Sequence, residues 1–305
     1  MKVGLIDIEP KIFNTAYMQI AAYYRGRGGF VDWWNPIMHR QFDVIFCSSL
    51  FNYTDKSDIP GDVICGGTGY DVHSQLSRVI ENCDLDYSIY PECRKSFLWF
   101  SRGCPRRCPW CVVPEKEGQI RPVPVKNLNP RTEYVVVCDN NFFANPEWEK
   151  AISYLRYLEL PCDFQGIDVR NITKNQVFSL SQLRHYKRIK FAWDVPGDEE
   201  KILAGIKCLV KYIRPYLLMC YVLIGYSSTE EEDLHRIETL RGLGIDPFVM
   251  PYDKKELYQR ALARYVNNKA IFKKVAWKDY RQRVSKQEEA GCGWTPPLGE
   301  AGWKI

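Results

Sequence analysis

The segment from residue 96 to residue 250 switches repeatedly between two hydrophobic periods, and this alternation restricts the fold more than any other feature. Short apolar runs typical of buried strands are followed by stretches with the period of amphipathic helices. The expected strands are 97–101, 134–138, 164–169, 189–193, 217–224 and 248–250, and the expected helices are 146–159, 173–186 and two that begin near residues 198 and 228. These units predict an α/β fold with a partial (β/α)6 barrel of the TIM type, whose active face lies at the strand carboxyl ends.

The beginning of the chain shows the same alternation on a smaller scale. Strand-like runs are expected at 3–8, 31–34, 44–47 and 63–65, and Tyr17, Ile20, Ala21 and Tyr24 fall at helical spacing. This pattern predicts a small parallel sheet in a Rossmann-like domain. The glycine-rich run 66–69 does not match G-x-G-x-x-G, so we interpret it as a turn. The expected division is a Rossmann-like domain at 1–92, the barrel at 93–253 and a C-terminal helical tail at 254–305.

Three cysteines lie close together directly after the first expected barrel strand. Cys104, Cys108 and Cys111 have the spacing C-x3-C-x2-C, at which thiolates can converge on one metal centre but rarely form relaxed disulfides. A closed structural site has four protein ligands, so three cysteines leave one position for a group that is not protein. The alternative is a zinc knot completed by Cys93 or Cys138. None of the four histidines lies near the three cysteines, which excludes the common Cys/His zinc patterns there.

The cysteine spacing, with Trp110 directly before the last cysteine, resembles the signature of the radical S-adenosylmethionine (radical SAM) superfamily. In that family the three cysteines hold a [4Fe-4S] cluster, and S-adenosylmethionine (SAM) chelates the fourth iron. An electron from the reduced cluster cleaves SAM to methionine and a 5'-deoxyadenosyl radical, which abstracts hydrogen from the substrate. The resemblance implies an enzyme with Cys104, Cys108 and Cys111 as metal ligands, Trp110 beside the cofactors, and an external electron donor of the flavodoxin or ferredoxin type. It does not identify the substrate.

The resemblance also implies SAM contacts at the ends of two later strands. Asp139 and Asn140 occupy the place of the family motif that binds the amino group of SAM. Ile224 and Gly225 end the fifth expected strand, where backbone groups of the family commonly meet adenine. Asp and Asn after a strand also turn the chain or cap the next helix, so a structural role for Asp139 and Asn140 stays open.

Two further acidic residues follow expected strands. Asp194 lies where family members often place a polar contact to the ribose or methionine of SAM, or it caps the helix that follows. Asp168 and Arg170 are two residues apart on a strand and share one face, so Asp168 either points to the barrel mouth as a cofactor contact or pairs with Arg170. Both interpretations of each residue are compatible with the sequence.

The first domain resembles the cobalamin-binding-like domain that precedes some radical SAM barrels. The D-x-H-x-x-G motif that supplies a histidine to cobalt would fall at residues 7–12, where Glu9 replaces the histidine and Ile12 the glycine. The motif therefore argues against cobalamin held by a histidine. Cobalamin bound without that ligand and a sheet that binds no cobalamin both stay open, and we expect no cobalamin. Only Cys292 among the remaining cysteines lies in a suggestive setting, and the others are scattered singly, so we expect one cluster.

Charge and hydropathy indicate the setting in which the chain works. No apolar run reaches the roughly 20 residues that span a bilayer, and the chain opens on a strand-like run rather than a signal peptide, so we expect a cytoplasmic protein with reduced cysteines and no membrane partner. Residues 254–286 hold eleven Lys and Arg against two acidic residues. Aromatic residues interleave with these cations, which fits a docked helix with a solvated face or a nucleic-acid surface. A zinc- or iron-sulfur-binding nucleic-acid module is therefore the alternative function.

Overall fold

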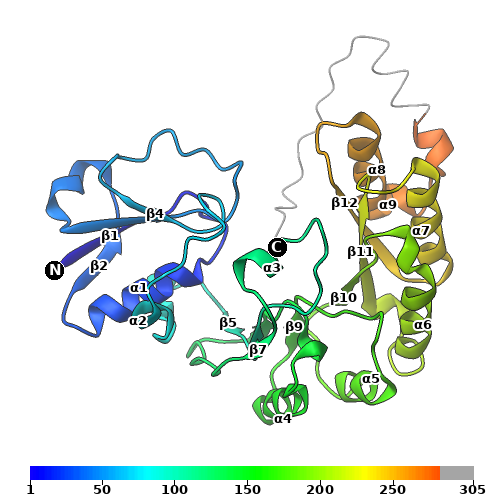
Figure 1. The fold of residues 1–305 in the computed structure, drawn as a ribbon, viewed down its shortest axis with the longest axis horizontal. Helices are drawn as coiled ribbons and strands as arrows, with labels where there is room; N and C mark the ends of the chain where they lie inside the picture. Colours follow the sequence, from blue (N-terminus) through cyan, green and yellow to red (C-terminus); the bar gives the residue numbers. More distant parts are fainter. Residues whose placement is uncertain (282–305) are drawn as a thin grey trace. The chain divides into compact units, whose positions relative to one another are not determined.

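The computed structural model describes residues 1–281, which fold into two compact units (Figure 1). One unit comprises residues 1–140 and 144–147, and the other comprises residues 141–143 and the described chain from 148. Parallel sheets and helices occur in this chain, so the expected α/β class is confirmed. The expected tail at 254–305 is described only as far as residue 281; its remainder, with Cys292, lies outside the described residues.

The first unit begins with a parallel sheet whose strand order is β2-β1-β3-β4. Its strands are β1 (Lys2–Ile6), β2 (Phe30–Trp33), β3 (Val44–Ser48) and β4 (Ile64–Gly66). Helix α1 (Thr15–Arg25) follows β1 and begins at Asn14, whose side chain accepts a hydrogen bond from the backbone of Ala16 at 3.0 Å. All four strands expected from the sequence are confirmed within about two residues, the usual uncertainty of element ends.

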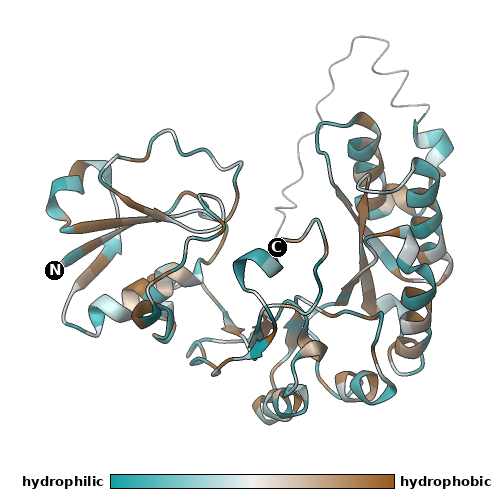
Figure 2. Ribbon diagram, viewed as in Figure 1, coloured by the Kyte–Doolittle hydropathy of each residue, from teal (hydrophilic) through white to brown (hydrophobic). Residues whose placement is uncertain are grey.

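The core of this unit explains why these residues form a sheet and a helix. Tyr17, Met18, Ile20 and Ala21 of α1 are buried in one cluster with strand residues such as Leu5. Apolar residues follow the strands and the sheet-facing side of the helix (Figure 2). Burying each large aliphatic side chain contributes about 1.5–3 kcal/mol, so the cluster stabilises the unit substantially.

The remainder of the first unit carries the cysteine loop. Strand β5 (Lys95–Leu98) pairs in parallel with β8 (Tyr134–Val137), and β6 (Ser101–Arg102) pairs antiparallel with β7 (Arg121–Pro122). The single strand expected at 97–101 is therefore wrong in its extent, because β5 ends at Leu98 and the chain changes partners. The short helices here are η1 (Pro36–Gln41), α2 (Arg78–Glu81), η2 (Tyr87–Ile89) and α3 (Val113–Lys116).

The second unit alternates strands and helices, as the sequence predicts. Strands β10 (Ile189–Ala192), β11 (Leu218–Ile224) and β12 (Asp246–Pro251) form a parallel sheet in that order. Strand β9 (Cys162–Phe164) precedes them in sequence and belongs to another sheet. The helices are α4 (Trp148–Leu158), α5 (Lys174–Ser181), α6 (Glu199–Leu209), α7 (Glu230–Gly242), α8 (Leu257–Asn267) and α9 (Lys269–Phe272), with 3-10 turns η3 (Phe142–Ala144), η4 (Pro196–Asp198) and η5 (Pro215–Leu217).

Strand β9 is shorter than expected and begins earlier. The sequence predicts a strand at 164–169, but β9 ends at Phe164. The carbonyl of Gly166 accepts a hydrogen bond from the backbone of Phe142 at 2.9 Å, and the side chain of Asp168 turns the chain by accepting from the backbone of Arg170 at 3.1 Å. These loop contacts replace a strand ladder after residue 164.

Local capping sets the starts of two helices in this unit. Helices α5 and α7 each begin with a capping box, formed by Thr173 with Gln176 and by Thr229 with Glu232. In both boxes the hydroxyl accepts from the third helical residue, whose own side chain accepts from the cap backbone. The expected helix starts near 173, 198 and 228 are therefore correct within two residues.

The first helix of the basic segment, α8, belongs to the second unit and packs against β12. Leu262, Tyr265 and Val266 of α8 are buried, whereas Arg260 and Arg264 are exposed. This amphipathic division is the docked arrangement that the sequence allowed, with the cations on the outer face. In the part of the chain that the structure covers, no helix combines the length and apolarity needed to cross a bilayer.

Candidate metal-binding loop

The three cysteines lie on a loop whose two ends are held together. Strands β6 and β7 form the neck of the loop, and the backbone of Val123 donates to the carbonyl of Phe100 at 3.0 Å. Just inside the neck, the backbone of Cys104 donates to the carbonyl of Gly118 at 3.2 Å. Closure at the neck fixes the two ends of the loop, so the cysteines are presented from a defined base.

Gly103 permits the tight path of the chain directly before Cys104. Its φ is +83°, in the left-handed region that side chains other than glycine rarely adopt, and an added Cβ would overlap the backbone of Gln119. A larger residue at this position would therefore force the neck of the loop open.

Two of the cysteines line a cavity of about 460 Å³, which falls in the range of small-molecule and cofactor sites. Its lining residues are Arg107, Cys108, Cys111, Pro114, Glu115, Gly118 and Gln119. The backbone of Cys111 donates to the carbonyl of Cys108 at 3.0 Å, so a turn brings these two positions to one cavity. Trp110 lies in the same turn and is half-buried.

The donor set fits a soft metal centre. Cys104, Cys108 and Cys111 are thiols, each partly exposed, and thiolates are the preferred ligands of iron-sulfur clusters and zinc. Across residues 1–281, no three His, Cys, Asp or Glu side chains are already gathered as a metal site. A metal bound by this loop would therefore have to draw the three cysteines together.

The two cysteines considered as a fourth ligand are in different surroundings. Cys93 is fully buried within the hydrophobic core of the first unit, and its thiol donates to the carbonyl of Lys95 at 3.4 Å. Burial raises the pKa of Cys93, which disfavours the thiolate that a metal needs. The thiol of Cys138 donates to the carbonyl of Val136 at 3.5 Å. These surroundings argue against Cys93 as a fourth metal ligand.

Glu117 connects the base of the cysteine loop to Asn140, in the turn after β8. Its carboxylate accepts from the backbone of Gly103 at 2.8 Å and from the side chain of Asn140 at 2.7 Å, and it pairs with Arg102 at 2.9 Å. Glu117 thus contacts the residue before the first cysteine. Asn140, expected to contact SAM, is brought to the cysteine loop by this carboxylate.

We expect replacement of Glu117 with alanine to destabilise the first unit by about 1–3 kcal/mol, because it leaves partly buried donors unsatisfied. Urea unfolding measures this change, and the reaction rate of the loop cysteines with a thiol reagent should rise as the base loosens. Glu115→Ala is the matched control, since Glu115 is exposed and should change stability by less than about 0.5 kcal/mol. Equal losses of stability in the two variants would contradict the role of Glu117 in holding the base of the cysteine loop.

Asp139 holds the chain where it passes from β5 to β6. It is 1% exposed and accepts from the backbone of Phe100 at 3.0 Å and from the hydroxyl of Ser101 at 2.6 Å. Burial raises the pKa of Asp139, and these hydrogen bonds partly oppose the rise. Asp139 thus has a structural role, but these contacts join distant residues rather than form the local turn or helix cap that the sequence left open. Its contact with SAM stays a prediction.

The raised pKa of Asp139 predicts a pH dependence of stability. The folded chain binds this proton more tightly than the unfolded chain, so wild-type stability declines as pH rises above the unfolded pKa of about 3.9 and levels off above the folded pKa. Asp139→Asn removes this titration. Urea unfolding between pH 4 and pH 7 should show stability of the variant improving relative to wild type as pH rises. A difference independent of pH would refute the assignment.

The other acidic candidates lie in the second unit. Asp168 pairs with Arg170 through two contacts of 2.8 and 3.1 Å, and Arg170 also binds Asp198 at 2.7 Å. These carboxylates raise the pKa of Arg170 against the opposing effect of burial. The ion pair expected as one interpretation of Asp168 is thus present. Asp194 follows β10 and is half-buried.

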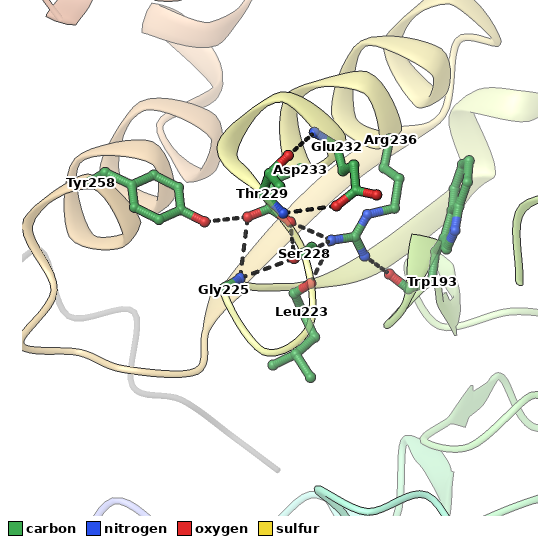
Figure 3. Close-up of polar contacts among 9 residues, drawn as sticks. All are labelled: Trp193, Leu223, Gly225, Ser228, Thr229, Glu232, Asp233, Arg236 and Tyr258. Carbon is green, nitrogen blue, oxygen red and sulfur yellow. Dashed lines mark hydrogen bonds and ion pairs between the residues drawn. The ribbon is translucent and has the colours of Figure 1, made fainter. Parts of the chain in front are cut away.

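Ile224 is the last residue of β11. Gly225 follows it and lies beside a buried polar network (Figure 3). The backbone of Gly225 donates to Asp233 at 3.1 Å, and Asp233 also accepts from Ser228 at 2.6 Å. Arg236 and Tyr258 bond the same carboxylate. Gly225 has a φ of +72°, and an added Cβ would overlap the side chain of Gln259. The turn expected to meet adenine is therefore rigid, with its amide bonded within the protein.

Sequence reasoning missed the residues that support these candidates. Glu117 and Asp233 act through partners that the fold brings to them, and neither belongs to the motif that drew attention to its segment. The local sign was their closeness in sequence to the predicted site residues: Glu117 directly follows α3, and Asp233 lies in the first turn of α7. A comparison with protein-family models and a comparison with curated proteins give no match for this chain.

Proposed function

We propose that this protein is a radical SAM enzyme. Cys104, Cys108 and Cys111 would hold a [4Fe-4S] cluster, and SAM would complete its coordination. The cluster and SAM together supply an electron transfer that yields a radical able to abstract hydrogen from a substrate. The observation that carries the proposal is a set of three thiols on one closed loop, two of them lining a cavity of about 460 Å³.

The fold is compatible with the proposal. The strand order β2-β1-β3-β4, with α1 after β1, supports a Rossmann-like first domain. Parallel pairing of β5 with β8, and of β10 with β11 and β12, supports a partial barrel over residues 93–253. The predicted boundary after residue 92 stays a prediction.

The protein's own residues have separable roles in this proposal. Glu117 and Asp139 fix the base of the cysteine loop, whose cysteines hold the metal. Asn140 and Trp110 would face the cofactor. Asp194, Ile224 and Gly225 belong to the second unit, and the SAM contacts expected for them stay predictions from the resemblance. Asp168 would orient Arg170 rather than contact SAM, because both of its oxygens already bind that guanidinium.

Cobalamin is not part of the proposal. Glu9 stands where a cobalt-ligating histidine would be expected, and its carboxylate is bound within the protein. It accepts from the backbones of Leu50 and Phe51 at 2.9–3.1 Å and from the hydroxyls of Ser49 and Thr54 at 3.0 and 2.7 Å. A carboxylate held this way supports a first domain that does not bind cobalamin through a histidine.

Anaerobic reconstitution with iron and sulfide tests the proposal. The expected result is a brown protein that, after reduction in the presence of SAM, releases 5'-deoxyadenosine. A colourless protein with stoichiometric zinc would overturn it in favour of the zinc module. A brown protein that leaves SAM intact would overturn it in favour of an iron-sulfur scaffold or sensor.

The alternative nucleic-acid module is favoured by one observation. Arg260 and Arg264 are exposed on α8, whose apolar face is packed against the second unit. Replacing both arginines with glutamate should abolish salt-dependent binding of an RNA or DNA oligonucleotide if the tail is a nucleic-acid surface. If the wild type does not bind the oligonucleotide, or if the double variant binds it equally well, the arginines do not form a nucleic-acid surface. The segment is then a docked helix with a solvated face.

A further inference from the structure

Cys47 and Cys65 lie side by side in the sheet of the first unit, away from the cysteine loop in sequence. Strands β3 and β4 are parallel neighbours, and their register pairs Cys47 directly with Cys65. Directly paired residues of adjacent strands project from the same face, and adjacent strands lie about 4.8 Å apart. This separation falls within the range of Cα distances that a disulfide can join.

A tight turn after β4 folds Tyr70 back onto the two cysteines. Gly67 has a φ of +90°, and the backbones of Gly69 and Tyr70 donate to the carbonyls of Ser49 and Gly67 at 2.8 and 3.0 Å. The hydroxyl of Tyr70 then lies 3.4 Å from the sulfur of Cys47. Burial and the two adjacent thiols raise the pKa of Tyr70, so its hydroxyl stays protonated and can donate to sulfur.

The two thiols differ in access. Cys65 is exposed, whereas Cys47 is 2% exposed. Burial raises the pKa of Cys47, and the adjacent Cys65 adds to the rise. A dissolved reagent can therefore reach Cys65 first, and only a group already on Cys65 is presented to Cys47. This arrangement is that of an attacking thiol with a resolving thiol behind it.

We propose that Cys47 and Cys65 form a thiol-disulfide exchange site for small disulfides such as oxidised glutathione. The thiolate of Cys65 attacks one sulfur of oxidised glutathione, forming a mixed disulfide and releasing one glutathione thiolate, which takes up the proton lost by Cys65. Cys47 then gives up its thiol proton and attacks the sulfur of Cys65 as a thiolate, which forms the Cys47–Cys65 bond. The second glutathione leaves as a thiolate and takes up the proton that Cys47 lost. Two thiols are oxidised, and one disulfide is reduced to two thiols.

The pair is connected to the cysteine loop by the segment that follows β4. The side chain of Lys116 donates to the carbonyl of Val72 at 3.5 Å, and that of Gln75 donates to the carbonyl of Lys116 at 3.4 Å. His73 lies 3.1 Å from the carboxylate of Glu115. Residues 72–75, which contact α3 of the cysteine loop, come seven to ten residues after Cys65. Formation of the disulfide at Cys65 therefore takes place close in sequence to these contacts.

Peptide mapping of the full chain tests this site directly. Trypsin cleaves after Lys56, so Cys47 and Cys65 fall in separate peptides, 41–56 and 57–78, each with one cysteine. The reduced protein is incubated with oxidised glutathione, alkylated, digested and analysed by mass spectrometry. The expected product is peptide 41–56 joined to peptide 57–78 by a disulfide.

Two variants check the order of events. Cys47→Ser should stop at glutathione bound to Cys65, and Cys65→Ser should give no linked peptides and no glutathione on Cys47. Cys83→Ser is the matched control and should leave the linked product unchanged. Glutathione that remains on Cys65 of the wild type, or a wild type that does not react at either cysteine, would overturn the proposal. The readout requires no cluster, so it is independent of the proposed function.

Discussion

Replacement of Cys108 with alanine is expected to abolish both the iron-sulfur cluster and the cleavage of SAM. Cys108 lies in the middle of the three-cysteine set and lines the cavity, so its loss leaves two thiolates where the proposed centre needs three. Loss of even a supporting residue around a metal costs roughly 10–100-fold in affinity or activity, so loss of a direct ligand should lower 5'-deoxyadenosine formation by at least about 100-fold. Iron content after reconstitution and product formation measure the two effects.

Cys138→Ala is the informative control for this prediction. Cys138 is the partly exposed cysteine that could complete a four-ligand zinc knot, whereas the proposed cluster does not use it. The control should keep its iron and its cleavage of SAM. Loss of metal from both variants would establish a four-ligand knot, and SAM cleavage retained by Cys108→Ala would exclude the assignment of the three cysteines.

Periodicity predicted most of the fold because the strands are short and apolar. β3, β8 and β11 could be recognised from buried runs bounded by polar residues. Periodicity predicted the wrong strand bounds where one apolar run is divided between two strands that pair with different neighbours. Residues 97–101 are continuous in hydropathy, but the buried carboxylate of Asp139 binds the backbone of Phe100 and separates β5 from β6. No pattern within five residues reveals a partner 39 positions away.

Within the candidate site, too, residues defined by a local pattern could be predicted, whereas residues defined by distant contacts could not. The three cysteines could be found from sequence because their spacing alone determines what they can bind. The Asp168–Arg170 pair was visible as one of two options, since both residues belong to one short segment. Glu117 could not be found, because its partners Gly103 and Asn140 are 14 and 23 residues away. Candidate residues that share one short segment are thus easier to predict than residues whose partners lie far along the chain.

Replacement of Asp233 with alanine is expected to lower the free energy of unfolding by about 3–5 kcal/mol. Asp233 and Arg236 are fully buried, and the carboxylate neutralises the guanidinium that also donates to the carbonyls of Trp193 and Leu223 at 2.8 and 2.9 Å. Removal of the carboxylate alone leaves a buried positive charge without its partner. Urea unfolding followed by circular dichroism measures the loss. Glu231→Ala, an exposed change on the same helix, should be within about 0.5 kcal/mol of wild type.

A second substitution separates the charge from the packing. Arg236→Met in the Asp233→Ala background removes the unpaired guanidinium, so the double variant should recover part of the stability lost by Asp233→Ala. The turn at Gly225 should loosen in both variants, because its amide loses the carboxylate that it binds at 3.1 Å. If Gly225 presents the adenine surface of the proposed enzyme, the double variant should be stable enough to assay yet bind SAM more weakly than wild type. A double variant less stable than Asp233→Ala would show that Arg236 stabilises the unit through packing and its backbone contacts, independently of Asp233.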